Sequence, residues 1–313
     1  MPDSLIRRLV FAALFALIPI FAFSQTSRSF FLTSGEASIH VKTFGDSTST
    51  PLMLINGGPG FSSEGFVPLA RELAASYYVI LHDQRGTGQS AFSELKQRYF
   101  TMDKMVADME AIREHLKLDQ WVLMGQSFGG MLAYHYAATY PDRVSAMIQS
   151  SSGGMNLEFH KTTGARISKR LSSEQRDSLA WWQRKRSAGD ESYSTRLGVG
   201  RNLAPAYVVD TQFIPAIAER LTQGNMNING LVHNAMIDIQ FDVTNAMKGF
   251  NKPVLIIHGA DDIIDPQIAR KAHTILPNSK LVILENSRHY GWLDRRETYL
   301  SEIRAFMAKQ ADS

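Results

Sequence analysis

A serine flanked by glycines is the first feature of the sequence that suggests chemistry. Ser127 lies in the run Gly125-Gln126-Ser127-Phe128-Gly129, between an apolar segment typical of a strand and a segment typical of a helix. A sharp strand-to-helix turn forces such a serine toward unfavourable backbone angles and exposes its hydroxyl above the sheet edge. Glycine suits both flanking positions because a side chain there would collide with the crossing strand and helix. The pattern predicts a nucleophilic serine, with an inert structural turn as the alternative.

The backbone around this serine is also expected to bind negative charge. The N–H group of Phe128 would lie at a helix N-terminus, where unpaired N–H groups and the helix dipole favour an anion. A second glycine-rich run, Asn-Gly-Gly-Pro-Gly at 56–60, follows a short apolar strand. Its glycines let backbone amides approach a substrate oxygen closely. We expect the N–H groups of Gly58 and Phe128 to form an oxyanion hole, although the glycines could simply make a tight turn.

An acidic partner for the serine is expected after the apolar segment 253–258. Aspartates follow this predicted strand at positions 261, 262 and 265. A carboxylate at the carboxyl end of a strand can reach the crevice where α/β proteins bind ligands. We select Asp262 for its Gly-x-x-Asp spacing, and keep Asp261 and Asp265 as alternatives. Each could instead hold a loop or cap a helix, as most such aspartates do.

His289 is the expected general base. It follows the last predicted strand, 280–284, in a polar loop, so the chain order is serine, acid, histidine. Such a histidine is well placed to accept the proton of the Ser127 hydroxyl. His82 and His258 also lie near strand ends, and we expect both to be buried core histidines.

Short apolar segments alternate with helical patterns around these residues. Strands are expected at 29–32, 37–44, 51–55, 77–81, 121–124, 144–149, 253–258 and 280–284, and helices at 67–75, 102–117, 128–140, 267–276 and 294–309. This alternation indicates an α/β fold with a mostly parallel sheet covered by helices on both faces. Asp103 is the expected N-cap of the helix at 102–117.

The alternation of strand and helix patterns is absent from the middle of the chain and from its start. Between 153 and 249 the sequence is rich in charge and poor in strand signals. We therefore expect a core formed by 25–152 and 250–313, interrupted by a helical cap at 153–249.

Residues 1–24 resemble a signal peptide, because basic residues precede the apolar run 9–23 and small residues follow. A retained anchor is the alternative, but the run is short for a bilayer span.

A cleaved signal peptide at 1–24 predicts an exported protein, periplasmic or extracellular, with no stable membrane span after cleavage.

The 313 residues include no cysteine, which excludes disulfides and a catalytic thiol. Lys and Arg number 33 against 30 Asp and Glu, and they are scattered, so no nucleic-acid partner is expected. No His-Glu-x-x-His or Gly-Lys-Ser/Thr pattern occurs, so no metal or nucleotide site is expected.

Taken together, the motifs resemble those of the proline iminopeptidase group of α/β-hydrolases. The resemblance rests on the segments 126–130, 56–60 and 83–90, and extends over about 30–150 and 252–306. It implies a serine exopeptidase without a cofactor, whose helical cap closes over the N-terminus of a peptide. Asn56 stands where the family usually has histidine, and we expect the oxyanion hole to survive the change. Asp83 and Arg85 are expected to be structural, with Arg85 bonded to Asp83 or to backbone carbonyls.

The same resemblance implies that cap glutamates hold the substrate amine, one of them in a Trp-Glu pair. Here Trp182 is followed by Gln183, a neutral amide. Glu219 is the expected second carboxylate, with Glu158, Glu174 and Glu191 as alternatives. A buried ammonium ion needs a carboxylate partner, so the missing glutamate weakens the expectation of a strict aminopeptidase. A compact apolar pocket is expected from the following aromatic residues: Trp181, Trp182, Tyr193 and Phe213.

The leading hypothesis is an exported serine hydrolase that releases an N-terminal residue from short peptides through an acyl-enzyme. The alternative is a carboxylesterase or amidase acting on small esters or amides. A binding protein on an inactive hydrolase scaffold is the least favoured reading. Haloalkane dehalogenases and epoxide hydrolases share this type of fold, but the family resemblance implies an aspartate in their strand-to-helix turn. The serine at position 127 therefore argues against both.

Overall fold

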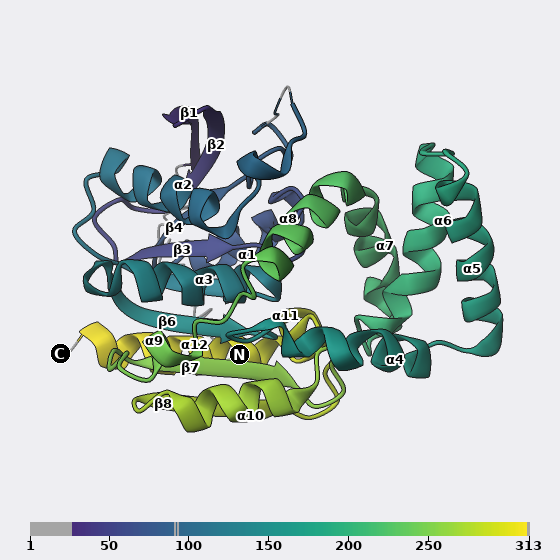
Figure 1. The fold of residues 1–313 in the computed structure, drawn as a ribbon. Coiled ribbons are helices and arrows are strands. Elements are labelled where there is room, and N and C mark those ends of the chain that lie inside the picture. The colour runs from purple at the N-terminus through teal and green to yellow at the C-terminus, as the bar shows by residue number, and fades with distance from the viewer. Residues whose placement is uncertain (1–26, 91, 93, 312–313) are drawn as a thin grey trace, which may run out of the picture.

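The fold is built on one eight-stranded sheet (Figure 1). The computed structural model describes residues 27–90, 92 and 94–311, so the expected signal peptide at 1–24 lies outside it. The strand order is β1-β2-β4-β3-β5-β6-β7-β8, with β2 antiparallel to both β1 and β4 and the remaining pairs parallel. The strands are β1 (Ser27–Ser34), β2 (Ala37–Phe44), β3 (Pro51–Ile55), β4 (Tyr78–His82), β5 (Trp121–Gln126), β6 (Val144–Ser150), β7 (Val254–Gly259) and β8 (Ser279–Leu284).

Helices cover both faces of the sheet, which explains why its central strands are apolar along their whole length. One face packs against α2 (Met102–His115), α3 (Phe128–Thr139) and α10 (Pro266–Ile275). The other packs against α1 (Val67–Leu73), α11 (Gly291–Asp294) and α12 (Arg296–Ala311). In β3, for example, Met53 and Ile55 enter the first core and Leu52 and Leu54 the second. The expected α/β fold is confirmed, and element boundaries differ from the prediction by only a few residues.

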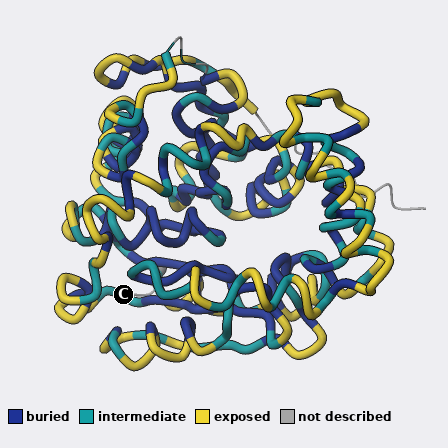
Figure 2. The backbone as a smooth tube through the Cα atoms, turned by 45° about the vertical axis from the view of Figure 1, so that its right-hand side comes forward, coloured by how far each residue is buried: buried dark blue, intermediate teal, exposed yellow. Residues whose placement is uncertain are grey.

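A helical segment separates β6 from β7 in the chain, although the two strands pair directly in the sheet. Its helices are α4 (His160–Arg170), α5 (Ser173–Ser187), α6 (Tyr193–Leu203), α7 (Ile214–Thr222), α8 (Met226–Asp238) and α9 (Thr244–Met247). A bridge between Asn156 and Asp242 joins the two ends of the segment. In Figure 1, α4 to α7 stand beyond the carboxyl ends of the parallel strands, whereas α9 lies beside the amino end of β7. We call the whole segment, 153–249, the cap. Figure 2 shows buried residues concentrated in the sheet and many exposed ones along the cap.

One local prediction, the N-cap of the helix expected at 102–117, was wrong. The N-cap of α2 is Thr101, whose hydroxyl accepts from the N–H of Lys104, whereas Asp103 accepts a hydrogen bond from His135 across to α3. Thr101 has the extended backbone that an N-cap requires, and Asp103 is already in the first helical turn.

Arg85 is structural and bonded to backbone carbonyls, as expected, while its acidic partner is Asp108 of α2 rather than Asp83. Its Nε and Nη2 donate to the Asp108 carboxylate at 2.5 and 2.7 Å, and Nη2 also donates to the carbonyl of Ser34. Within the described part of the chain, no helix has both the length and the apolar character needed to cross a bilayer.

Candidate active site

Ser127 occupies the tight turn between β5 and α3. Its backbone has φ 56° and ψ −119°, a conformation that is strained for a residue with a side chain and costs about 1–3 kcal/mol. The turn is this tight because the two flanking glycines leave no room for side chains. A Cβ on Gly129 would lie 2.2 Å from the carbonyl oxygen of Ile55. The strain fixes the Ser127 side chain at the carboxyl edge of the sheet, where it lines a cavity.

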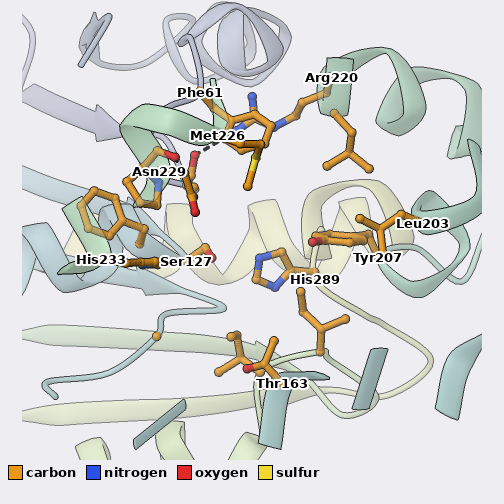
Figure 3. Close-up of a pocket in the computed structure, with 18 of the residues that line it drawn as sticks. Phe61, Ser127, Thr163, Leu203, Tyr207, Arg220, Met226, Asn229, His233 and His289 are labelled. Atoms are coloured by element: carbon orange, nitrogen blue, oxygen red, sulfur yellow. Dashed lines mark hydrogen bonds between the residues drawn. The ribbon is translucent and has the colours of Figure 1, made fainter. Parts of the chain in front are cut away.

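His289 lines the same cavity and is held from behind by Asp262. The Nδ1 atom of His289 lies 2.8 Å from Oδ1 of Asp262, and both side chains are buried. The N–H of His289 donates to the carbonyl of Tyr207, and its own carbonyl accepts from Nε2 of Gln126, the residue before Ser127. The imidazole is therefore fixed in orientation beside the serine turn (Figure 3).

Asp262 is ionised in this environment. Burial alone would raise its pKa, but the nearby His289 and His258, together with the hydrogen bond from His289, outweigh burial and lower the pKa to about 2. The N–H of Ile264 also donates to Oδ1 at 2.9 Å. A charged carboxylate at Nδ1 favours the tautomer of His289 that leaves Nε2 free to accept a proton.

Two backbone N–H groups point to an anion site beside Ser127. In the described part of the chain, neither Gly58 nor Phe128 has a hydrogen-bond acceptor for its N–H. The loop 56–60 approaches the serine so closely that a Cβ on Gly57 would lie 2.8 Å from Cβ of Ser127. Asn56, the first residue of this loop, is buried and donates to the carbonyl of Phe61 at 3.1 Å. The expected oxyanion donors are thus next to the serine, with Asn56 bracing the loop.

The alternatives weighed from the sequence lie elsewhere. Asp261 pairs with Arg170 and Arg288 at the surface, and Asp265 caps α10. His258 is buried with its Nε2 3.4 Å from Oδ2 of Asp262, so it lies behind the carboxylate and away from the cavity. His82 is fully buried at the end of β4, and burial lowers its pKa to about 4.

The cavity has a volume of about 690 Å³ and is covered by cap helices. Figure 3 shows Ser127 and His289 on its floor, with Arg220, Met226 and Asn229 contributed by the cap. Its aromatic lining consists of Phe61, Phe128, Phe159, Tyr207 and Tyr290. The aromatic residues expected from the sequence, Trp181, Trp182, Tyr193 and Phe213, are not among the described lining residues.

Of the expected substrate-binding residues, only Gln183 lines the cavity. Glu219 is exposed and accepts a hydrogen bond from the hydroxyl of Tyr193 at 2.6 Å. Trp182 packs against Gly198 of α6. Neither Glu219 nor Trp182 is among the described lining residues, and the sequence alone did not reveal which face of each cap helix meets the cavity. Glu191, an alternative in the sequence analysis, is the single acidic residue among the described lining residues, and Arg186 pairs with it at 3.0 Å.

Three further lining residues were not anticipated. Arg220 is buried in the cavity wall, Tyr207 packs edge-on against the His289 ring, and His233 projects from α8. Burial and the neighbouring His160 lower the pKa of His233 to about 4, so it is neutral near pH 7. No sequence motif marks these residues, and a polar side chain in a helix is ordinarily expected to face solvent.

Comparison with known proteins agrees with this architecture. A profile of the alpha/beta hydrolase fold family matches residues 50–295. The chain therefore belongs to the α/β-hydrolase family and is a hydrolase of that fold.

Among curated proteins, the chain resembles proline iminopeptidases. It is 29% identical over 266 residues to the proline iminopeptidase of Lacticaseibacillus rhamnosus (strain Lc 705), covering 82% of this chain and 89% of that protein. It is also 29% identical to the proline iminopeptidase of Clostridioides difficile (strain 630), covering 81% and 88%.

Solved structures share the fold. The crystal structure of a proline iminopeptidase of Mycobacterium smegmatis aligns with a TM-score of 0.68 and 20% identity, over 90% of this chain and 98% of that one. The 2-hydroxy-6-oxo-6-phenylhexa-2,4-dienoate hydrolase of Rhodococcus sp. strain RHA1 aligns with a TM-score of 0.71 and 19% identity, over 91% and 100%.

Proposed function

We propose that the protein is a serine hydrolase that releases the N-terminal residue of short peptides through an acyl-enzyme. One observation carries the proposal: the strained Ser127 shares a cavity with His289, and a buried, ionised Asp262 holds that imidazole. The curated relatives named proline iminopeptidase support the peptide substrate.

The chemistry follows from the positions of these groups. The Ser127 hydroxyl attacks the carbonyl carbon while Nε2 of His289 accepts its proton, and Asp262 stabilises the imidazolium. The N–H groups of Gly58 and Phe128 stabilise the oxyanion of the tetrahedral intermediate. When that intermediate collapses, the C–N bond breaks and the imidazolium protonates the leaving amine. Water then attacks the acyl-enzyme, with His289 again as the base, and releases the acid and the free serine.

Glu191 is the proposed partner of the substrate's α-ammonium group. It is the acidic residue of the described cavity lining, and its side chain is 56% exposed in the structure. A substrate that covers this carboxylate would bring its ammonium ion and the acid together out of water. Arg186 pairs with Glu191 in the structure, so an incoming ammonium must compete with this guanidinium.

A carboxylesterase or amidase acting on small uncharged acyl groups is the second candidate. The neutral Gln183 and the Arg186–Glu191 pair favour it, because they leave the described lining without an unpaired carboxylate. We also retain the proposal that residues 1–24 are a signal peptide and that the protein is exported. N-terminal sequencing of the mature protein from fractionated cells tests the export proposal.

Labelling and substrate assays separate these functions. A fluorophosphonate should label Ser127, identified by mass spectrometry, and Ser127→Ala should abolish both labelling and turnover. Cleavage of proline or alanine p-nitroanilide supports the aminopeptidase. Turnover of p-nitrophenyl esters without either amide supports the esterase. A folded protein that is neither labelled nor active would be a binding protein on this scaffold.

A further inference from the structure

Arg220 of cap helix α7 is a buried cation in the wall of the cavity. Its side chain enters from the cap above Ser127 and His289 in Figure 3, and the residue is only 5% exposed. Among the described residues, no carboxylate lies within ion-pair distance of it. A buried guanidinium without an acidic partner is expensive, and its neutral partners must offset the loss of hydration.

Those partners lie in or just after the glycine-rich loop 56–60 and next to His289 in the chain. Nη2 donates to the carbonyl of Gly57 at 3.1 Å, and Nη1 donates to the carbonyl of Ser62 at 3.4 Å. Nε donates to the hydroxyl of Tyr290 at 3.0 Å. The guanidinium also lies 4.8 Å from the ring centroid of Phe66, within cation–π range.

The bond to Gly57 bears on the oxyanion hole because of peptide geometry. The carbonyl of Gly57 and the N–H of Gly58 belong to one planar trans peptide, so fixing the oxygen fixes the direction of the N–H. Glycine has little conformational preference of its own, and Gly58 has φ 67°, so the orientation of this peptide depends on its hydrogen bonds. Nδ2 of Asn56 also donates to the carbonyl of Gly57, at 3.3 Å, and the bond from Arg220 is the shorter and the charged one. A charge-assisted bond to the carbonyl also polarises the amide and strengthens its N–H as a donor.

Other cap residues hold the same loop. Nδ2 of Asn229 donates to the carbonyl of Pro59 at 2.9 Å, and the N–H of Asn225 donates to the carbonyl of Gly60 at 2.8 Å. The carbonyls of Gly57, Pro59 and Gly60 are therefore all hydrogen-bonded to α7, α8 or the N-cap of α8.

We propose that Arg220 is a positioning residue that aligns the Gly58 N–H for the oxyanion, so that the cap completes the oxyanion hole of the core. This inference rests on the proposed function. It predicts that losing Arg220 impairs stabilisation of the transition state more than binding of the substrate.

The test compares Arg220→Gln with wild type on whichever ester or anilide the wild type turns over. The kcat should fall about 10- to 100-fold, less than or similar to the loss of a whole oxyanion donor, while KM changes less than about threefold. Binding of a boronic acid, which forms a tetrahedral adduct with Ser127, should weaken by a similar factor. Arg220→Lys, which keeps the charge and can reach one carbonyl, should recover part of the kcat.

Arg201→Gln is the matched control, because Arg201 is an exposed arginine of cap helix α6 that is not among the described lining residues. It should keep wild-type kcat, KM and boronate affinity. If Arg220→Gln does not fold, Asn229→Ala provides the test. Its kcat should fall by less than the kcat of Arg220→Gln is expected to fall. Its boronate binding should again weaken more than its KM changes.

The outcomes separate the two proposals. A wild type that is active and labelled at Ser127, together with unchanged kcat and boronate affinity in Arg220→Gln, overturns the role of Arg220 alone. A loss confined to thermal stability or to KM does the same, because it indicates a purely structural role. A wild type that is neither active nor labelled overturns the proposed function and this inference together.

Discussion

Gly125 lies so close to Gly129 that it cannot carry a side chain: a Cβ on Gly125 would lie 2.3 Å from the carbonyl oxygen of Gly129. The contact holds the end of β5 against the start of α3 and so defines the turn on which Ser127 lies. Gly129 is packed equally closely on its other side, because a Cβ there would lie 2.2 Å from the carbonyl oxygen of Ile55 in β3.

Gly129→Ala should therefore lower the free energy of unfolding by about 1–3 kcal/mol or more, because backbone must move to admit the methyl group. Gly164→Ala is the control. Gly164 lies within α4 with open space around its Cα, so alanine there should raise stability by about 0.5–1 kcal/mol. Urea unfolding at 25 °C measures both. Wild-type stability in Gly129→Ala would contradict the packing argument.

The backbone strain at Ser127 predicts that Ser127→Gly is more stable than wild type. Glycine adopts φ 56° without the penalty that a side chain incurs. Part of the gain is offset by the greater entropy of glycine in the unfolded chain, so we expect about 1 kcal/mol. Ser127→Ala lacks the hydroxyl but keeps the strained Cβ, and it should not gain stability. Equal melting temperatures for the two variants would argue against stored strain.

Asp262→Asn should lower kcat by about 10⁴-fold with little change in fold, because the amide favours the wrong tautomer of His289. Asp261→Asn is the neighbouring control. Its carboxylate pairs with Arg170 and Arg288 at the surface, so kcat should stay at the wild-type level. Steady-state kinetics on one substrate, with circular dichroism to verify folding, measures the contrast. A larger loss in Asp261→Asn would show that the acid had been assigned to the wrong residue.

Glu191→Gln should raise KM for aminoacyl anilides about 10- to 100-fold, the effect of losing a hydrogen bond to a charged group. Turnover of p-nitrophenyl acetate, which has no ammonium group, should be unaffected. Glu219→Gln should change neither, because Glu219 is not among the described lining residues and is bonded to Tyr193. If the effects of the two variants were reversed, the cap would hold the amine through Glu219, as the family resemblance implies.

His82 should make the protein less stable in mild acid. Burial lowers its pKa from 6.5 to about 4, and the charge of Asp83 opposes this only in part. Between these values the unfolded chain binds the proton and the folded chain does not, so stability falls as pH decreases from 6.5 toward 4. From pH 7.5 to pH 5, wild type should lose about 2 kcal/mol more than His82→Gln. Urea unfolding at both pH values measures the difference, and equal losses would mean that His82 is protonated in the folded state.

The sheet was predictable because its strands are apolar and end at glycine-rich or acidic turns. For β3, the strand, its glycine loop and the next helix are all visible in the sequence at 51–75. The clustering of Ser127, Asp262 and His289 followed from the same logic, since all three come after parallel strands and therefore meet at one edge of the sheet. Their catalytic roles remain predictions.

The cap was less predictable because some of its helices bury polar side chains, such as Arg220 and Thr222 of α7. In α5, Trp182 packs against Gly198 while Gln183 lines the cavity, and the sequence around them does not distinguish the two directions. Arg220 and Glu219 are adjacent in α7, but one is buried over the glycine loop and the other is exposed. Only tertiary packing decides which of two neighbours on a helix meets the core.

The direct pairing of β6 with β7 across the inserted helices has a consequence for biosynthesis. Ser127 is translated before the cap, whereas the acid and the imidazole arrive only with the chain that follows it. A nascent chain that has completed β6 presents the serine on an unfinished sheet with no base to deprotonate it. Under the proposed mechanism, hydrolytic activity therefore requires that the distal segment, which carries Asp262 and His289, has docked on the sheet.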